Sequence, residues 1–426
     1  MRVGILGCGN VGAALVRAIT DDGDLIARRT GVRLEVARVA VRDPARPRSV
    51  DLAPGVLTGD AAAVVADPDV DVVVEVVGGL DPARDLVRAA LAAGKPVITA
   101  NKELLARHGA ELFVAAADAG VDLLFEAAVA GGIPLMRPLR ESLVGERIHR
   151  VTGIVNGTTN YVLTRMTEEG SDLASAVAEA QALGYAEQDP TADVEGFDAA
   201  AKAAIIASIA FGARVTADDV HREGITAITA DDIAAAADLG YVVKLLAVAE
   251  VRDGAIGVRV HPAMVPVDHP LASVRGSFNA VFIEGSNVGQ IMLYGRGAGG
   301  GPTASAVLGD LIDAAKNLRA GARGATIGDL ADRPIAPVAD TTSRFYVSLD
   351  VIDRPGALAA IAGVFGEHGV SIESMQQEGR GEGARLIFVT HLAREADLTA
   401  TITEIAGLAV VGRVGSVLRV VGGEDE

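Results

Sequence analysis

One segment of the sequence, residues 184–202, combines several carboxylates with a lysine. Asp198 and Lys202 are four residues apart at the start of a predicted helix, so their side chains share one face of it. On a surface helix this spacing is ordinary ion-pair stabilisation. Here the following residues, 203–210, are nearly all apolar, which indicates a buried helix. A buried lysine needs a charged partner or a lowered pKa, and both conditions suit acid–base chemistry.

A second lysine, Lys102, directly follows a predicted strand at residues 96–99. Open α/β sheets place their ligand crevice at the carboxyl ends of the strands, so Lys102 is in position to touch a substrate. The alternative is a surface lysine at a helix start, where the helix dipole disfavours a cation. The chain has five lysines against 33 arginines, and unlike an arginine a lysine can lose its proton.

A glycine motif, G-x-G-x-x-G at residues 7–12, lies between the first predicted strand and a predicted helix. Gly7 permits a tight turn, Gly9 lets the backbone approach a pyrophosphate, and Gly12 lets the helix pack on the sheet. The helix N-terminus then favours the anion. The motif in this position predicts a dinucleotide site, and the alternative is a turn without a ligand. The sequence lacks the P-loop motif of nucleotide kinases.

The window from residue 28 to residue 48 carries seven arginines and two acids, although the whole chain has a net charge of −18. Arg42 falls at the end of the second predicted strand, where dinucleotide domains contact the adenosine ribose. An arginine there suits a 2′-phosphate, which favours NADP and leaves NAD open. A solvated basic face is the alternative.

The elements that must position these residues follow two patterns. Short β-branched runs alternate with alanine-rich stretches in the N-terminal third, which is typical of a parallel Rossmann-type sheet. Beyond about residue 130, longer strands mix irregularly with helices and indicate a mixed α/β domain. The last part reads β-α-β-β-α-β, the ferredoxin-like order. We expect domains at 1–130, with a helix near 303–320 returning to it, at 131–320 and at 344–426, and a linker at 321–343.

Composition limits the class of protein. With 426 residues the chain fits two or three domains, and its acidic balance argues against a general nucleic-acid or anionic-membrane binder. A single cysteine, Cys8, excludes an intrachain disulfide, and its place in the glycine motif suits packing better than redox chemistry. The first ten residues lack a signal-peptide pattern, and no apolar run reaches the ~20 residues that span a bilayer. We therefore expect a cytoplasmic protein.

Five stretches occur in this order: GCGNVG from residue 7, TANK from 99, GIVNGTTNYVL from 153, GYAEQDPTADVEGFDAAAKAAI from 184 and GRGAGGGPTASAV from 295. Together they resemble the homoserine dehydrogenase family, in the form with a C-terminal ACT domain. The resemblance implies NAD(P)-dependent interconversion of L-homoserine and L-aspartate 4-semialdehyde, in threonine, methionine and isoleucine biosynthesis. It also implies that the second domain is catalytic and forms a homodimer or homotetramer.

The resemblance assigns roles to single residues. Lys102 and Lys202 would handle the alcohol proton and polarise the carbonyl, and Asp198 would orient Lys202. The expected substrate-binding residues are Glu187, Asp193, Tyr185 and Thr158. The expected cofactor-binding residues are Gly7, Gly9, Asn10, Val11, Gly12, Arg42, Thr99, Asn101, Lys102 and Gly297.

The resemblance further implies two accessory sites. A loop would bind Na⁺ or K⁺ through the backbone oxygens of Glu126, Val129, Gly131 and Ile133, and a glycine hinge is the alternative. The loop with Asp353, Gly356 and Ala357 would hold an amino-acid effector, L-threonine, and the alternative is a helix start without a ligand. Scattered histidines and one cysteine give no support for zinc.

Two other functions fit the same motifs. One is another NAD(P)-linked amino-acid dehydrogenase, and the other is a non-catalytic amino-acid sensor that uses the dinucleotide fold only to bind. The presence of Lys102, Asp198 and Lys202 together argues against the sensor.

Overall fold

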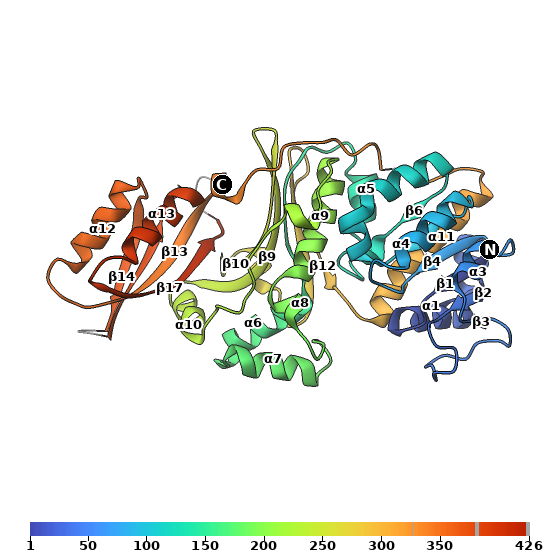
Figure 1. Ribbon diagram of the computed structural model, residues 1–426, viewed down its shortest axis with the longest axis horizontal. Helices are drawn as coiled ribbons and strands as arrows, with labels where there is room; N and C mark the ends of the chain where they lie inside the picture. The colour runs from blue at the N-terminus through green and yellow to red at the C-terminus, as the bar shows by residue number, and fades with distance from the viewer. Residues whose placement is uncertain (326, 380–382, 423–426) are drawn as a thin grey trace.

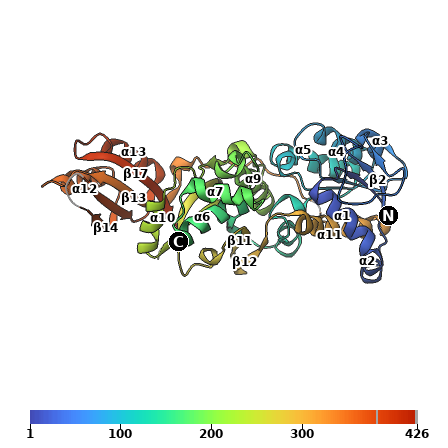
Figure 2. The ribbon, with the colours of Figure 1, turned by 90° about the horizontal axis from the view of Figure 1, so that it is seen from below.

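The computed structural model describes residues 1–325, 327–379 and 383–422, arranged in three parts along one axis (Figure 1). The N-terminal part lies at one end of the molecule and the C-terminal part at the other, with the middle of the chain between them (Figure 2). Among the described residues, no helix is both long enough and apolar enough to cross a membrane.

The N-terminal part is a six-stranded sheet in which all neighbouring strands are parallel, as predicted. Its order is β3-β2-β1-β4-β5-β6. The strands are β1 (Arg2–Leu6), β2 (Glu35–Ala40), β3 (Leu57–Thr58), β4 (Val72–Glu75), β5 (Val97–Thr99) and β6 (Leu123–Leu124). The helices are α1 (Asn10–Asp21), α2 (Gly23–Thr30), α3 (Ala61–Ala66), α4 (Ala83–Ala92), α5 (Lys102–Ala119) and, from far along the chain, α11 (Gly300–Arg319). The strand order reverses between β1 and β4, which creates a ligand crevice there.

The middle part combines a mostly antiparallel sheet with a group of helices. Its strands are β7 (Ile148–Ile154), β8 (His221–Arg222), β9 (Tyr241–Arg252), β10 (Ala255–Pro266), β11 (Phe278–Gly285) and β12 (Gly289–Arg296). Its helices are α6 (Gly157–Glu169), α7 (Leu173–Ala182), α8 (Thr191–Val194), α9 (Phe197–Phe211) and α10 (Ala230–Asp238). The strand β9, which the sequence pattern did not predict, and its neighbour β10 are each 12 residues long. The two strands form a hairpin whose turn, Asp253 and Gly254, has positive φ at both residues.

The C-terminal part has the predicted βαββαβ order and the strand order β17-β13-β15-β14. Its elements are β13 (Thr342–Val351), α12 (Ala357–Glu367), β14 (Ile372–Glu378), β15 (Ala384–Thr390), the short β16 (Ala393–Arg394), α13 (Glu395–Ile405) and β17 (Val411–Val420). Side chains alternate across β13, so Phe345 packs under α12 and α13 while Tyr346 faces the middle part of the molecule. Both faces of β13 therefore take part in apolar packing, whereas β14 at the edge of the sheet is mostly exposed.

The middle and C-terminal parts share one continuous sheet of 11 strands, because β17 pairs in parallel with β10. The pairing joins Ala263 to Arg419 and Met264 to Val420. The preceding segment, predicted as a linker at 321–343, runs along the middle part, where Ile256 exchanges backbone hydrogen bonds of 2.9 and 2.8 Å with Pro334 and Ala336. The sequence contains no pattern that predicts this union of two sheets.

Candidate active site

A cleft of about 750 Å³ lies between the N-terminal and middle parts. Asn10 and Lys102 line it from the Rossmann side, Asp193 and Lys202 line it from the middle part, and Gly297 lies on the chain that returns to α11. The cleft thus brings the glycine motif and the acid–lysine segment together, although they are almost 200 residues apart in the sequence.

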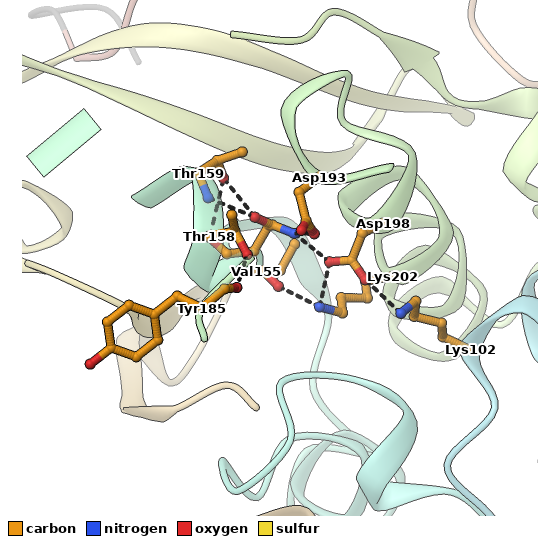
Figure 3. A network of polar contacts seen from close by, with 9 residues as sticks. Lys102, Val155, Thr158, Thr159, Tyr185, Asp193, Asp198 and Lys202 are labelled. Atoms are coloured by element: carbon orange, nitrogen blue, oxygen red, sulfur yellow. Dashed lines mark hydrogen bonds and ion pairs between the residues drawn. The ribbon is translucent and has the colours of Figure 1, made fainter. Parts of the chain in front are cut away.

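The centre of the cleft is an ionic network of two lysines around one carboxylate (Figure 3). The Nζ atom of Lys102 lies 2.8 Å from one oxygen of Asp198, and the Nζ atom of Lys202 lies 2.6 Å from the other. Lys202 also donates a 2.8 Å hydrogen bond to the backbone oxygen of Val155. The side chain of Lys202 is 11% exposed and that of Lys102 is 36% exposed, so Lys102 is the more open of the two to a substrate.

Burial and charge act against each other in this network. Burial raises the pKa of Asp198, but the two ammonium groups outweigh it and hold this pKa well below its usual range. Asp198 raises the pKa of Lys102, and burial opposes that rise. Burial also raises the pKa of Asp193, against the hydrogen bond from Asn156. At neutral pH the centre therefore holds an ionised Asp198 beside a protonated Lys102.

The sequence reading overlooked Asn156, which connects the two carboxylates. Its amide nitrogen donates to Asp193 at 2.6 Å and to Asp198 at 2.8 Å. Its side-chain oxygen accepts hydrogen bonds from the backbone N–H and the hydroxyl of Thr159, at 2.8 and 2.9 Å, and so caps α6. The capping pattern of Asn156 and Thr159 before an apolar run could have drawn attention to this residue.

The buried start of α9 explains why Asp198 and Lys202 meet. Gly196 precedes the helix with φ of 79°, and every residue from Asp198 to Ser208 is buried. Alanine dominates this stretch, so the helix packs tightly, and its two charged side chains bond to each other and to polar groups at the cleft, among them the Val155 oxygen and the Asn156 amide. This confirms that the helix is buried, as its apolar sequence predicts.

Lys102 is positioned by the short loop between β5 and α5, which hydrogen bonds attach to the end of β4 and the loop after it. The buried carboxylate of Glu75 accepts a 2.6 Å hydrogen bond from the Thr99 hydroxyl. Asn101 caps α5 through the Leu104 N–H at 3.1 Å and donates to the backbone oxygen of Gly79 at 2.6 Å. Asn101 lines the cleft, whereas Thr99 is fully buried behind it. The role of Thr99 is therefore to hold the loop in place through its hydrogen bonds.

Three further predicted substrate residues line the same cleft. The hydroxyl of Thr158 donates a 2.6 Å hydrogen bond to the backbone oxygen of Tyr185. The Tyr185 ring lies 4.9 Å from that of Tyr161, and Figure 3 shows it pointing away from Asp198. Glu187 is exposed at the cleft wall, outside the ionic network. The cleft therefore contains all four predicted residues, and Asp193 joins the network through Asn156.

The glycine motif leaves room for a dinucleotide. A Cβ added at Gly7 would lie 2.7 Å from the backbone oxygen of Val76, and one at Gly12 would clash with the Gly7 carbonyl, so both glycines are required by packing. At Gly9 an added Cβ would meet no atom within 4 Å, which leaves open space before the N-terminus of α1. Asn10 and Val11 line the adjoining cleft. These residues fit a pyrophosphate.

The other predicted cofactor residues have different surroundings. Gly297 lines the cleft and packs against the Asn279 amide, with which an added Cβ would clash. Arg42 follows β2, is exposed and lies outside the residues that line the cleft. Two of the seven nearby arginines, Arg33 and Arg38, form ion pairs with acidic residues, which reduces the positive charge available to a ligand.

Comparisons with known proteins agree with this geometry. Family models match the homoserine dehydrogenase NAD-binding domain at residues 7–126, homoserine dehydrogenase at 134–312 and the ACT domain at 345–410. A homoserine dehydrogenase of Corynebacterium glutamicum is 53% identical over 98% of this chain and 95% of its own length. Another, from Mycobacterium tuberculosis, is 51% identical over 99% of this chain and 97% of its own length. The chain belongs to the homoserine dehydrogenase family.

Solved structures of homoserine dehydrogenases have the same fold. That from Thiobacillus denitrificans has a TM-score of 0.94 at 41% identity, over 99% of this chain and 98% of its own. A hyperthermophilic archaeal homoserine dehydrogenase in complex with NADPH has a TM-score of 0.62 at 31% identity, over 74% of this chain and 97% of its own. The chain is thus an NAD(P)-dependent oxidoreductase that acts on a CH–OH group.

The predicted cation-binding residues lie in a buried loop. The Glu126 carboxylate accepts hydrogen bonds from the N–H groups of Leu135, Met136 and Arg137, so this side chain already has partners within the loop. Val129, Gly131 and Ile133 are buried in the same turn. Carbonyl oxygens suit Na⁺ or K⁺. Among the described residues, no group of His, Cys, Asp or Glu forms a metal site.

The predicted effector loop lies on the ACT domain, away from the cleft. Gly356 has φ of 89° and precedes α12, so it takes a conformation that favours glycine. Asp353 is exposed, and Ala357 is buried in the first turn of the helix. The backbone N–H groups at the start of α12 are the groups with which this homoserine dehydrogenase chain could hold a carboxylate.

Proposed function

We propose that the chain interconverts L-homoserine and L-aspartate 4-semialdehyde with NADP or NAD. The observation that carries the proposal is the cleft itself, in which a Lys102–Asp198–Lys202 network faces the open space beside the glycine motif. Bound nicotinamide would supply the hydride acceptor or donor. The protein must then handle the proton of the hydroxyl group and the charge that develops on its oxygen.

The network is suited to that proton and charge. In aldehyde reduction the carbon gains a hydride and the oxygen gains a proton, so a nearby ammonium group can stabilise the alkoxide and donate the proton. Lys102 is protonated and partly exposed to the cleft, and Lys202 is held in place by Asp198 and the Val155 oxygen. In homoserine oxidation the hydroxyl group must lose this proton, which passes either directly to a lysine or through water.

The acidic wall is suited to the substrate ammonium group. Asp193 is largely buried, and burial raises its pKa, so a bound ammonium would stabilise its ionised form. Glu187 adds a second carboxylate at the exposed side of the cleft. Tyr185 and Thr158 complete this wall through their own hydrogen bond. An α-amino acid with a hydroxylated side chain would therefore bind with its ammonium at Asp193 and its hydroxyl near the lysines.

Absorbance of the reduced nicotinamide tests the proposed activity directly. Reduction of NAD or NADP should depend on L-homoserine, and L-aspartate and L-alanine should not replace it. Lys202→Met should lower kcat about 10²-fold or more, whereas the exposed Lys316→Met, on α11, should have little effect. Retained turnover in Lys202→Met would remove this lysine from the proton-transfer step and leave Lys102.

The preference for NADP rests on Arg42. A guanidinium at the end of β2 can bind a 2′-phosphate with charge-assisted hydrogen bonds, so Arg42→Ala should raise KM for NADP about tenfold and leave KM for NAD unchanged. Arg28→Ala, an exposed arginine on α2, provides the control. An unchanged ratio between the two cofactors in Arg42→Ala would contradict the preference.

Regulation, assembly and cation binding are proposals of the same kind. The ACT domain supports inhibition by L-threonine, with Asp353, Gly356 and Ala357 as the expected effector loop. Initial rates with and without L-threonine test this inhibition.

Assembly is tested by light scattering, in which the measured molar mass distinguishes a homodimer from a homotetramer. Comparison of rates in NaCl, KCl and tetramethylammonium chloride tests the cation at the Glu126–Ile133 loop.

A further inference from the structure

A second cavity, of about 450 Å³, lies at the seam between the ACT domain and the middle part of the molecule. Ser348, Arg385 and Arg413 line it from the ACT sheet, and Glu223 and Asp232 line it from the opposite side. None of the residues of this seam cavity lines the active-site cleft, and the effector loop before α12 is not part of it. The known chemistry of the cleft therefore leaves the seam cavity unexplained.

One wall of the seam cavity is a bulge in the ACT sheet. The pairing of β13 with β17 skips at this point, so Gly415 and Ser416 on β17 lie opposite the single residue Ser348 on β13. A Cβ added at Gly415 would lie 3.1 Å from the Ser348 carbonyl oxygen, which shows how closely the strands approach. A bulge interrupts the ladder of backbone hydrogen bonds, and bulges occur often beside functional sites. The bulge therefore shapes one wall of the seam cavity.

The same wall carries positive charge. Arg385 forms ion pairs with Asp231 at 3.0 Å and with Asp350 at 3.4 Å. Arg413 uses only its Nε atom on Asp350, at 3.0 Å, and its side chain is 66% exposed. The terminal nitrogens of Arg413 are thus accessible to an anion, in the planar arrangement that a carboxylate can meet with two hydrogen bonds.

The facing wall carries negative charge. Asp232 is buried, and it accepts the backbone N–H and hydroxyl of Thr229 on a single oxygen, Oδ2, at 2.9 and 2.6 Å, which leaves Oδ1 for a ligand. Glu223 lies on the same side. Burial raises its pKa, but hydrogen bonds from His221 and Arg419 hold it well below the usual range. Opposite charges on facing walls match a small molecule with both an anionic and a cationic end.

We propose that the seam cavity binds a free α-amino acid as its zwitterion, with the carboxylate at Arg413 and the ammonium at Oδ1 of Asp232, beside the Glu223 carboxylate that Arg419 holds. The proposal deepens the regulatory part of the proposed function, because it assigns an effector class to a site other than the loop before α12. Its volume accepts an aliphatic or hydroxylated side chain, and the serines at the bulge supply polar contacts.

Occupancy of the seam cavity has a direct physical connection to the active site. On one side of Glu223, the buried guanidinium of Arg419 on β17 donates to both of its oxygens, at 2.7 and 3.0 Å. Arg419 also donates to Glu395 at the start of α13, at 2.7 and 3.0 Å. Glu223 is therefore held by the ACT domain although it belongs to the middle part.

The neighbours of Glu223 in the sequence pack on the segment 194–197 of the active site. The N–H of Ile225 donates to the Val194 oxygen at 2.8 Å, and a Cβ added at Gly224 would lie 2.7 Å from the Cα of Glu195. The Arg222 guanidinium lies 3.5 Å from the centre of the Phe197 ring. These contacts hold the segment 194–197 in place. This segment connects Asp193 to Asp198, the two carboxylates of the active site. A ligand that shifts Glu223 therefore shifts the acidic wall that holds the substrate ammonium.

Calorimetric titration of the full-length protein tests the site, with L-threonine, L-valine and L-isoleucine as probes and their methyl esters as controls that lack the carboxylate. At least one free amino acid should bind, and its ester should bind about tenfold more weakly or worse. Arg413→Gln should weaken binding of that amino acid about tenfold. The matched control is Arg394→Gln, since Arg394 is a 52% exposed ACT arginine outside the cavity, and this variant should bind like the unmodified protein.

A kinetic measurement then tests the connection. The bound amino acid should change KM for L-homoserine more than KM for the nucleotide, and Arg413→Gln should remove this change. The seam site is refuted if none of the probes binds, or if Arg413→Gln and Arg394→Gln bind equally. It is also refuted if Gly356→Val abolishes binding while Arg413→Gln retains it. Failure of the proposed activity would be seen separately, as absence of homoserine-dependent nucleotide reduction without any effector.

Discussion

Asp198→Asn is the most informative change in the active site, because the substitution keeps the shape of the side chain and removes the charge between two lysines. In the unmodified protein its oxygens lie 2.8 Å from Lys102 and 2.6 Å from Lys202. The variant would leave two ammonium groups facing an amide. We expect Lys202 to lose its fixed orientation and Lys102 to lose the charge that keeps it protonated.

The size of the effect follows from the contacts. Two unit charges about 4 Å apart interact by about 4 kcal/mol at an effective dielectric constant of 20. Because the Lys102 side chain is 36% exposed, solvent screens part of this, and about 1.5–3 kcal/mol per charge-assisted contact is the better figure. Loss of one contact from the reacting geometry lowers kcat about 10- to 100-fold, and loss of both lowers it further.

The assay is the pH dependence of kcat/KM for aldehyde reduction and for homoserine oxidation. Asp198 is the largest cause that raises the pKa of Lys102, and burial lowers it, so loss of the carboxylate should lower this pKa although Glu103 and Asp193 still raise it. Aldehyde reduction needs the ammonium form of Lys102. As the pH rises, its rate should therefore fall at a lower pH in Asp198→Asn than in the unmodified enzyme. Asp189→Asn, in the same segment but exposed and outside the cleft, is the control. A rate within threefold of the unmodified enzyme and an unshifted pH profile would refute the reasoning.

Three further predictions concern the surrounding structure. Asn156→Ala removes hydrogen bonds to two carboxylates and should lower kcat/KM for homoserine about 10- to 100-fold; a larger change in KM for the nucleotide would argue against this role. Gly9→Val fills open space without a clash, so KM for both nucleotides should rise at least about tenfold while the melting temperature stays within about 2 °C; thermal unfolding and initial rates check it. Burial raises the pKa of Asp310 to about 7. The folded state then binds this proton more tightly than the unfolded chain, so the unmodified protein should lose stability between about pH 4 and 7, and urea unfolding of Asp310→Asn should lack that loss.

The sequence predicts the parallel sheet and the ACT-type domain because both have strong local patterns. Valine-rich runs separated by alanine-rich helices identify the Rossmann strands, and the βαββαβ order is complete within the last eighty residues. The strand β9 was missed because its run, Tyr241–Arg252, is apolar on both faces and resembles a buried helix as much as a strand. The Asp253-Gly254 turn that follows is the feature that distinguishes a hairpin.

The active site could be predicted where a charged residue occurs in a segment that the sequence predicts to be buried. Lys202 attracts attention because a lysine in an alanine-rich buried helix is costly without a partner, and the structure supplies Asp198. Asn156 was missed because an amide carries no net charge and also serves as an ordinary helix cap. The union of β10 with β17 joins residues more than 150 positions apart, and no local pattern encodes such a pairing.

That union has a consequence for how the protein folds and how its parts can be separated. The ACT domain closes the edge of β10, so its removal would expose an unpaired strand edge together with the apolar surface of the middle part on which Tyr346, Leu418 and Val420 pack. A truncated chain would tend to aggregate for reasons unrelated to regulation. The two parts should therefore melt in a single cooperative transition, and the ACT sheet serves as a structural cap of the catalytic sheet.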